Sequence, residues 1–212
     1  MIERGIVVNG QVLPGTERVV RSDDAWWASG SWGTRPRKGH RVTEGCLHWT
    51  TSAPSTGPDA GRIAVRNTRA RKSKKGGPLE VAVHFYVFPD AIVQTCDLAD
   101  AAVHIGHRPT ILRSVGIEVD YPGTHAQAKK LGIPHEVVRG VAKGLPVKAM
   151  APPAESVANL LWLVDALCSA DHPLLVIPRK RARLTEPGWI EHADAPGTKV
   201  DCAGVFWPLL GL

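Results

Sequence analysis

The chain has 212 residues, of which 43% are hydrophobic and 22% are charged, as in an ordinary soluble globular protein with one sizeable core. Its longest apolar runs, such as residues 157–167, are too short and too interrupted to span a bilayer. The net charge of +6 comes from basic residues at positions 62–75, in a segment without acids, so the rest of the chain is nearly neutral.

The N-terminus, Met1 to Gly5, has no basic region leading into an apolar stretch, so a secretory signal is not expected. We therefore expect synthesis in the cytoplasm. Action outside the cell would then need release or transport by another route. Without export, the four cysteines are not expected to form disulfides.

The first half of the chain is predicted to consist of strands and irregular segments. Residues 6–15 read as a hairpin, because Asn9-Gly10 is a favoured two-residue turn. Residues 16–43 are rich in Gly, Ser, Arg and Trp and are expected to form an irregular surface arm. Residues 46–51, within a strand-like run at 44–52, are predicted to form a buried strand. Residues 53–79 become basic and are expected to form either a loop or a loop with a poorly defined helix.

The second half is predicted to contain further strands and one strong helix. Residues 80–87 and 91–96 alternate around Pro89-Asp90 and read as a hairpin. A short helical turn is expected before His104, and a strand at 114–119. Residues 121–153 are punctuated by Gly and Pro, which indicates a surface excursion.

The clearest helix is predicted over residues 153–168. Its apolar residues recur at the i, i+3, i+4 spacing of one helix face: Val157, Leu160, Leu161, Val164, Leu167 and Cys168. Residues 174–177 are a further candidate strand. Strands mixed with one strong helix predict a single α/β domain, with a mixed central sheet flanked by helices.

Metal-ligating residue types lie at the two ends of this predicted domain. His48 lies in the early strand, and residues 192–204 supply His192, a lysine, Asp201 and Cys202. Two imidazoles with one thiolate or carboxylate form a three-ligand zinc site that leaves the fourth position open. A hydrolase needs that open position, because zinc lowers the pKa of bound water to near 7.

The order of several sequence blocks resembles a known family. The blocks are the strand with His48, Ala82–Val87, Ala101–Gly106, Val115–Val119, the long helix, and finally His192…Lys199…Cys202-Ala203-Gly204. Together they resemble the zinc-dependent N-acetylmuramoyl-L-alanine amidases of the type 2 amidase family, which includes phage lysozymes and peptidoglycan recognition proteins. The resemblance covers about residues 44–210. No single block is specific, and the inference rests on their order.

The resemblance implies an amidase-like fold and a zinc ion held by His48, His192 and a third ligand. We favour Cys202 as that ligand, because a thiolate is a softer and stronger zinc ligand and because Ala203-Gly204 matches the family's Pro-Gly. Asp201 remains the alternative. The resemblance also implies that Lys199 stabilises the oxyanion and that Glu118 orients or deprotonates the attacking water.

Two more histidines, His84 and His104, are implied as substrate contacts, although His84 is equally compatible with packing behind the cleft. The chain departs from the family where a tyrosine is replaced by Val83 and a tryptophan by Val103. Taken alone, each candidate has a simpler interpretation, such as a core histidine, a buried thiol or a solvated lysine.

These residues predict a division into an N-terminal hairpin and arm at 1–43 and a zinc amidase-like catalytic domain at 44–212. The expected reaction is hydrolysis of the amide bond between N-acetylmuramic acid and L-alanine in peptidoglycan or muropeptide, as in an endolysin or a wall-recycling enzyme. The alternative is a non-catalytic peptidoglycan-binding module on the same fold. We expect a monomer, with polyanion contact through the basic loop at 62–75.

Overall fold

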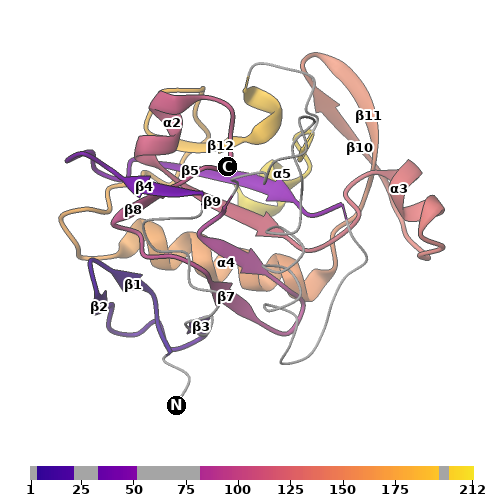
Figure 1. Cartoon of the computed structure of the whole chain (residues 1–212). Coiled ribbons are helices and arrows are strands. Elements are labelled where there is room, and N and C mark those ends of the chain that lie inside the picture. Colours follow the sequence, from indigo (N-terminus) through magenta and orange to yellow (C-terminus); the bar gives the residue numbers. More distant parts are fainter. Residues whose placement is uncertain (1–3, 22–32, 52–81, 196–200) are drawn as a thin grey trace.

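A six-stranded mixed sheet forms the centre of the protein in a computed structural model that describes residues 4–21, 33–51, 82–195 and 201–212 (Figure 1). Its strands, in spatial order, are β12 (Gly188–Glu191), β5 (Glu44–Trp49), β9 (Ser114–Val119), β6 (Phe85–Val87), β7 (Ile92–Gln94) and β3 (Val19–Arg21). The first four strands are parallel, whereas β7 is antiparallel to β6. The predicted α/β class with a mixed central sheet is confirmed.

Three smaller strand pairs surround this sheet. They are β1 (Val7–Val8) with β2 (Gln11–Val12), β4 (Thr34–Pro36) with β8 (Asp100–Ala102), and β10 (Val137–Ala142) with β11 (Leu145–Met150). The helical elements are α2 (Arg108–Arg113), α3 (His125–Lys130), α4 (Ala154–Ser169), η1 (His192–Asp194) and α5 (Phe206–Leu210). The β10–β11 hairpin projects from the body beside α3 (Figure 1). None of the described helices has the length and apolar character needed to cross a membrane.

The long helix α4 covers one face of the sheet (Figure 1), and its buried residues belong to the main hydrophobic core. Side chains alternate along each strand, so Leu47, Phe85 and Ile117 share one row and pack in the same core as Leu160 and Leu163 of α4. The intervening residues of these strands therefore point away from α4. They include Cys46 and His48 on β5 and Gly116 and Glu118 on β9.

Several sequence-based expectations are confirmed. The first hairpin turns at Asn9-Gly10, and both residues have the positive φ that a type I′ turn requires. The β6–β7 hairpin and the helix α4 also form where they are predicted. On α4, however, Val157 and Leu161 are only half buried, while Leu163 is fully buried. The helix face is therefore rotated slightly from the predicted one.

Other expectations are corrected. The helical turn predicted before His104 is instead strand β8, which pairs with β4. The region 16–43, expected to be an irregular arm, contributes β3 to the central sheet and β4 to a pair. The excursion at 121–153 contains α3 and a regular hairpin. Residues 174–177 form only an isolated bridge, between Leu175 and Val42.

A buried arginine, which follows β4, connects segments that lie far apart in the sequence. Arg37 is only 3% exposed, and its guanidinium donates hydrogen bonds to the carbonyl oxygens of Leu98, Leu112 and Ser114 at 2.6, 2.9 and 3.0 Å. Burial lowers the pKa of Arg37 to about 10, which still leaves it charged at neutral pH. One side chain thus satisfies three carbonyl groups, one just before β8 and two at the junction of α2 and β9.

We expect Arg37→Leu to lower the free energy of unfolding by at least about 3 kcal/mol, because an unsatisfied buried carbonyl costs about 1–3 kcal/mol. Urea denaturation followed by circular dichroism measures this change. The matched control is Arg35→Leu, since Arg35 is exposed on β4 and should change stability by less than about 0.5 kcal/mol. Equal effects of the two substitutions would contradict a structural role for Arg37.

Candidate metal centre

Two histidines meet at the ends of neighbouring parallel strands. Residue Glu191 of β12 pairs with Leu47 of β5, so the next residue of each chain segment, His192 and His48, lies at the same level of the sheet. Their Nδ1 atoms are 3.0 Å apart. His48 is 2% exposed, whereas the His192 side chain is 13% exposed. The two predicted histidine ligands are therefore brought together, with His192 on the solvent side.

Asp201 completes a group of three donor atoms. Its Oδ2 lies 3.1 Å from Nδ1 of His192 and 3.8 Å from Nδ1 of His48. Burial alone would raise the pKa of the Asp201 carboxyl, but its hydrogen bond with His192 and the closeness of His48 hold that pKa below its ordinary value. The carboxylate thus stays ionised, which is the form that ligates a metal.

The segment that carries Asp201 is fixed by backbone hydrogen bonds. The Asp201 carbonyl accepts from the amide of Ala193 at 2.5 Å, and the Ala203 carbonyl accepts from the amide of Val141 on the β10–β11 hairpin at 2.6 Å. A Cβ on Gly140 would lie 2.4 Å from that Ala203 oxygen. The absence of a side chain at this position is what lets the hairpin approach so closely.

The spacing of the three donor atoms fits a tetrahedral metal ion. With bonds of about 2.0–2.1 Å, two ligands of a tetrahedral zinc ion lie about 3.3 Å apart. The three separations here, 3.0, 3.1 and 3.8 Å, bracket that value. Two imidazoles and one carboxylate are also a donor set that zinc accepts, with the fourth position left open.

Cys202, the third ligand favoured from the sequence, is not part of this group. Its side chain is fully buried in the hydrophobic core. Burial raises the pKa of the Cys202 thiol well above its usual value, and the nearby Glu191 and Asp201 carboxylates raise it further. Among the described residues, the group that includes both His48 and His192 contains Asp201 instead.

Glu118 lies beside the histidine pair on the next strand. It is paired in register with His48 of β5 and with Tyr86 of β6, so the three side chains share one row on the face opposite α4. Glu118 is half buried, and Tyr86 is 4% exposed. Tyr86 was not singled out from the sequence. The alternation of residues 83–87 would have placed it on this face, but not in this row.

His104 and His84, predicted as substrate contacts, lie behind the candidate centre. His104 is 8% exposed, and its Nδ1 is 3.0 Å from Nε2 of His48. His84 is fully buried, with its Nδ1 accepting from the amide of Gly116 and its Nε2 close to the Asp100 carbonyl. Burial lowers the pKa of His84 to about 3, so its ring stays neutral. Protein groups thus occupy the ring nitrogens of both residues.

Lys199 and the basic loop at 62–75 lie outside the described residues, and their assignments stay predictions. Within the described residues, a second trio of metal-ligating side chains lies next to the first. It consists of Cys46, His48 and His104, whose ligand atoms are within 4.8 Å of one another. No feature of the sequence connects Cys46, which we interpreted as a buried small residue, with this centre.

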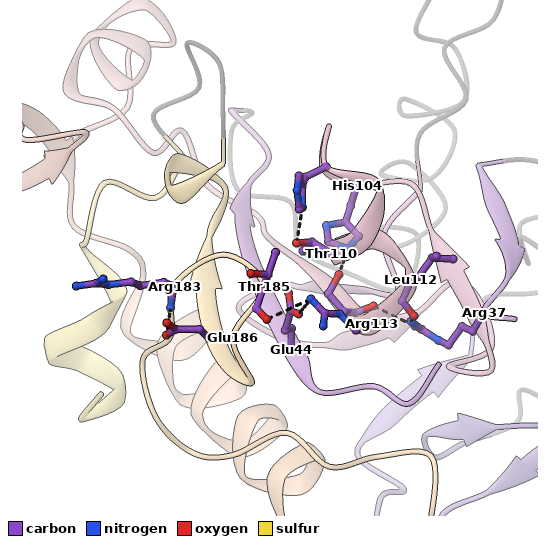
Figure 2. A network of polar contacts seen from close by, with 11 residues as sticks. Arg37, Glu44, His104, Thr110, Leu112, Arg113, Arg183, Thr185 and Glu186 are labelled. Carbon is purple, nitrogen blue, oxygen red and sulfur yellow. Dashed lines mark hydrogen bonds and ion pairs between the residues drawn. The ribbon is translucent and has the colours of Figure 1, made fainter. Parts of the chain in front are cut away.

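A buried ion pair lies at the opposite end of β5 from His48. The fully buried Glu44 has its Oε1 2.9 Å from Nη2 of Arg113, which also donates to the Thr185 carbonyl (Figure 2). Burial raises the pKa of Glu44 to about 7, although Arg113 and Thr110 partly oppose this rise. The folded protein therefore holds a proton on Glu44 at pH values where the unfolded chain has released it.

We expect Glu44 to make the protein less stable as the pH rises from about 4.5 to about 7. The reason is that the native pKa lies above the unfolded one, so ionisation costs up to about 3 kcal/mol in the folded state. Glu44→Gln should flatten this part of the stability profile, as measured by thermal unfolding between pH 5 and 8. The exposed Glu186 gives a control, Glu186→Gln, and an unchanged slope in Glu44→Gln would contradict the assignment.

The candidate centre lies within a region that matches a known protein family. The family described as N-acetylmuramoyl-L-alanine amidase matches residues 38–204. Among solved structures, the chain is similar to an AmpD derivative, with 15% identity, a TM-score of 0.50, and coverage of 89% of this chain and 96% of that one. It is also similar to human PGRP-IBETAC in complex with glycosamyl muramyl pentapeptide, with 16% identity and a TM-score of 0.52. That match covers 93% of this chain and 95% of the other. No curated protein sequence matches.

Proposed function

Because this chain belongs to the N-acetylmuramoyl-L-alanine amidase family, we propose that it hydrolyses the amide bond between N-acetylmuramic acid and L-alanine in peptidoglycan or its fragments. The observation that carries this proposal is the convergence of His48, His192 and Asp201 within 3.8 Å of one another. These residues come from segments more than 140 positions apart, and simple core packing does not require three such groups to meet.

His48, His192 and Asp201 would hold a zinc ion. When bound, such an ion lowers the pKa of water to near 7 and polarises the scissile carbonyl. We assign the third position to Asp201 in place of Cys202, since the aspartate faces both histidines and is held ionised. Cys202 instead lies in the core with a raised thiol pKa.

Glu118 is the proposed general base. It lies one strand away from His48 in the same row, on the face of the sheet that bears the candidate centre. Its carboxylate would take a proton from the attacking water and transfer that proton to the leaving amine of L-alanine. Lys199 is proposed to stabilise the negative charge on the carbonyl oxygen, the role that oxyanion-hole donors fill in other hydrolases.

The biological setting that we propose is that of an endolysin acting on the wall after release or of an enzyme acting on recycled muropeptide in the cytoplasm. The protein would act as a monomer. The basic loop at 62–75 would add contact with a polyanion, because clustered Lys and Arg bind phosphate-rich polymers without sequence preference.

The experiment that tests the proposal compares turbidity loss of purified peptidoglycan with the appearance of free L-alanine amino groups. We expect both with the purified protein, loss of both after chelation, and recovery on addition of zinc. Sedimentation with peptidoglycan in the same samples separates the alternative. Binding without release of amino groups, at any zinc concentration, would identify a non-catalytic peptidoglycan-binding module.

A further inference from the structure

A chain of two hydrogen-bonding contacts runs away from the candidate metal centre into the protein. His48 directs Nδ1 toward His192 and Asp201, and its other ring nitrogen, Nε2, is 3.0 Å from Nδ1 of His104. The far nitrogen of His104, Nε2, is 2.8 Å from the hydroxyl oxygen of Ser114. The rings of His48 and His104 are nearly perpendicular, at 83°, so the contact is made edge-on rather than by stacking.

The protons of these two hydrogen bonds can be arranged in only two ways, and a metal ion bound at Nδ1 of His48 allows only one of them. If Ser114 accepts from Nε2–H of His104, then Nδ1 of His104 is free to accept from Nε2–H of His48. Nδ1 of His48 then carries a lone pair toward His192 and Asp201, as a metal ligand requires. In the reverse arrangement His48 would be protonated on Nδ1, where the metal would bind.

The surroundings of His104 exclude solvent from these two hydrogen bonds and hold the ring in place. Ser114 is fully buried, and His104 is 8% exposed. The ring of His104 lies over Gly116, where a Cβ would come within 2.5 Å of the ring. Each ring nitrogen of His104 faces one hydrogen-bonding partner, so a neutral ring accepts at one nitrogen while it donates at the other.

We propose that His104 is a positioning residue that fixes the tautomer and the ring orientation of His48, with Ser114 fixing the tautomer of His104 in turn. This inference rests on the proposed function, because it assigns His48 to a metal through Nδ1. It differs from the role first expected for His104, which was substrate contact. The ring has its two nitrogens committed to His48 and Ser114, so it has none left for a substrate.

A second metal ion is the competing interpretation of the same residues. Cys46, His48 and His104 form a trio that could itself hold an ion. In that case the ion, rather than a proton, would join Nε2 of His48 to Nδ1 of His104. The separation of 3.0 Å between these two nitrogens is that of a direct hydrogen bond. A second ion there, together with one at Nδ1, would require both ring nitrogens of His48 to be deprotonated, whereas a neutral imidazole keeps one proton.

The test compares zinc affinity, by chelator competition, in the parent protein and in three variants. We expect His104→Phe to weaken zinc binding by about 10–100-fold, the usual cost of losing the hydrogen-bond partner of a ligand. We expect Ser114→Ala to weaken it by less than about tenfold. His107→Phe is the matched control, because His107 contacts Thr110 of its own helix instead of His48, and it should stay within about twofold of the parent.

Two further measurements on the zinc-loaded parent decide the proposal even if His104→Phe does not fold. In nitrogen-15 NMR spectra we expect a scalar coupling between Nε2 of His48 and Nδ1 of His104, which only a hydrogen bond between them transmits. We also expect one zinc ion per chain. Absence of the coupling, two ions per chain, or unchanged zinc affinity in a folded His104→Phe variant would each overturn the proposal. Failure of the amidase proposal would appear separately, as a parent protein that binds zinc without releasing L-alanine amino groups.

Discussion

Asp201→Ala is expected to weaken zinc binding by more than about 100-fold and to abolish amidase activity. Loss of a residue that only hydrogen-bonds to a metal ligand costs about 10–100-fold, and loss of a ligand itself should cost more. The physical reason is that Asp201 is the only anionic group among the three donors, so its removal leaves two neutral imidazoles to compensate the charge of a divalent ion. Metal analysis after dialysis and chelator competition measure the affinity. Release of L-alanine amino groups from peptidoglycan measures the activity.

Cys202→Ala is the matched control for this substitution, because it removes the neighbouring side chain that the sequence favoured as ligand. We expect it to retain one zinc ion per chain. Its cost is to stability, since it shortens a fully buried side chain. If Cys202→Ala loses zinc while Asp201→Ala keeps it, the assignment of the third ligand is reversed.

Glu118→Gln is expected to lower the rate of amide hydrolysis by about 10²–10⁴-fold, the usual contribution of a general acid–base group. Glutamine keeps the shape of the side chain but cannot accept the proton of the attacking water. Because Glu118 lies in the row of His48 but outside the three donor atoms, zinc affinity should stay within about threefold of the parent. Initial rates on a defined muropeptide, with zinc content measured in parallel, separate the two effects.

The exposed Glu136, which precedes β10, provides the control for this experiment. Glu136→Gln removes the same charge from the protein without approaching the candidate centre and should leave the rate unchanged. A Glu118→Gln variant with the parent's rate would show that the proton is transferred by another group. Tyr86, which shares the same row, is the first residue that we would then test.

The sequence predicted the elements on which the centre is built because strand alternation and turn chemistry are local. The Asn9-Gly10 turn, the β6–β7 hairpin and α4 each depend on a few neighbouring residues. The same alternation places His48 and Glu118 on the strand faces opposite Leu47 and Ile117. The histidine pair was predicted from residue types and their order along the chain.

The choice between Asp201 and Cys202 could not be made in this way, because adjacent residues point in different directions and a turn decides which one faces the histidines. The turn that follows has Ala203 and Gly204 at positive φ, and it is held by the β10–β11 hairpin through the amide of Val141. That hairpin is far away in sequence, and its approach depends on the missing side chain of Gly140.

The sequence by itself therefore determined the family, the α/β class and the two histidines, because residue order, local periodicity and imidazole chemistry are properties of short segments. Only the tertiary structure decided that Asp201 joins them, that Glu118 and Tyr86 share a row with His48, and that His104 lies behind His48. Strand register and the packing of loops against glycines set these placements, and both depend on contacts between segments that the linear order does not pair.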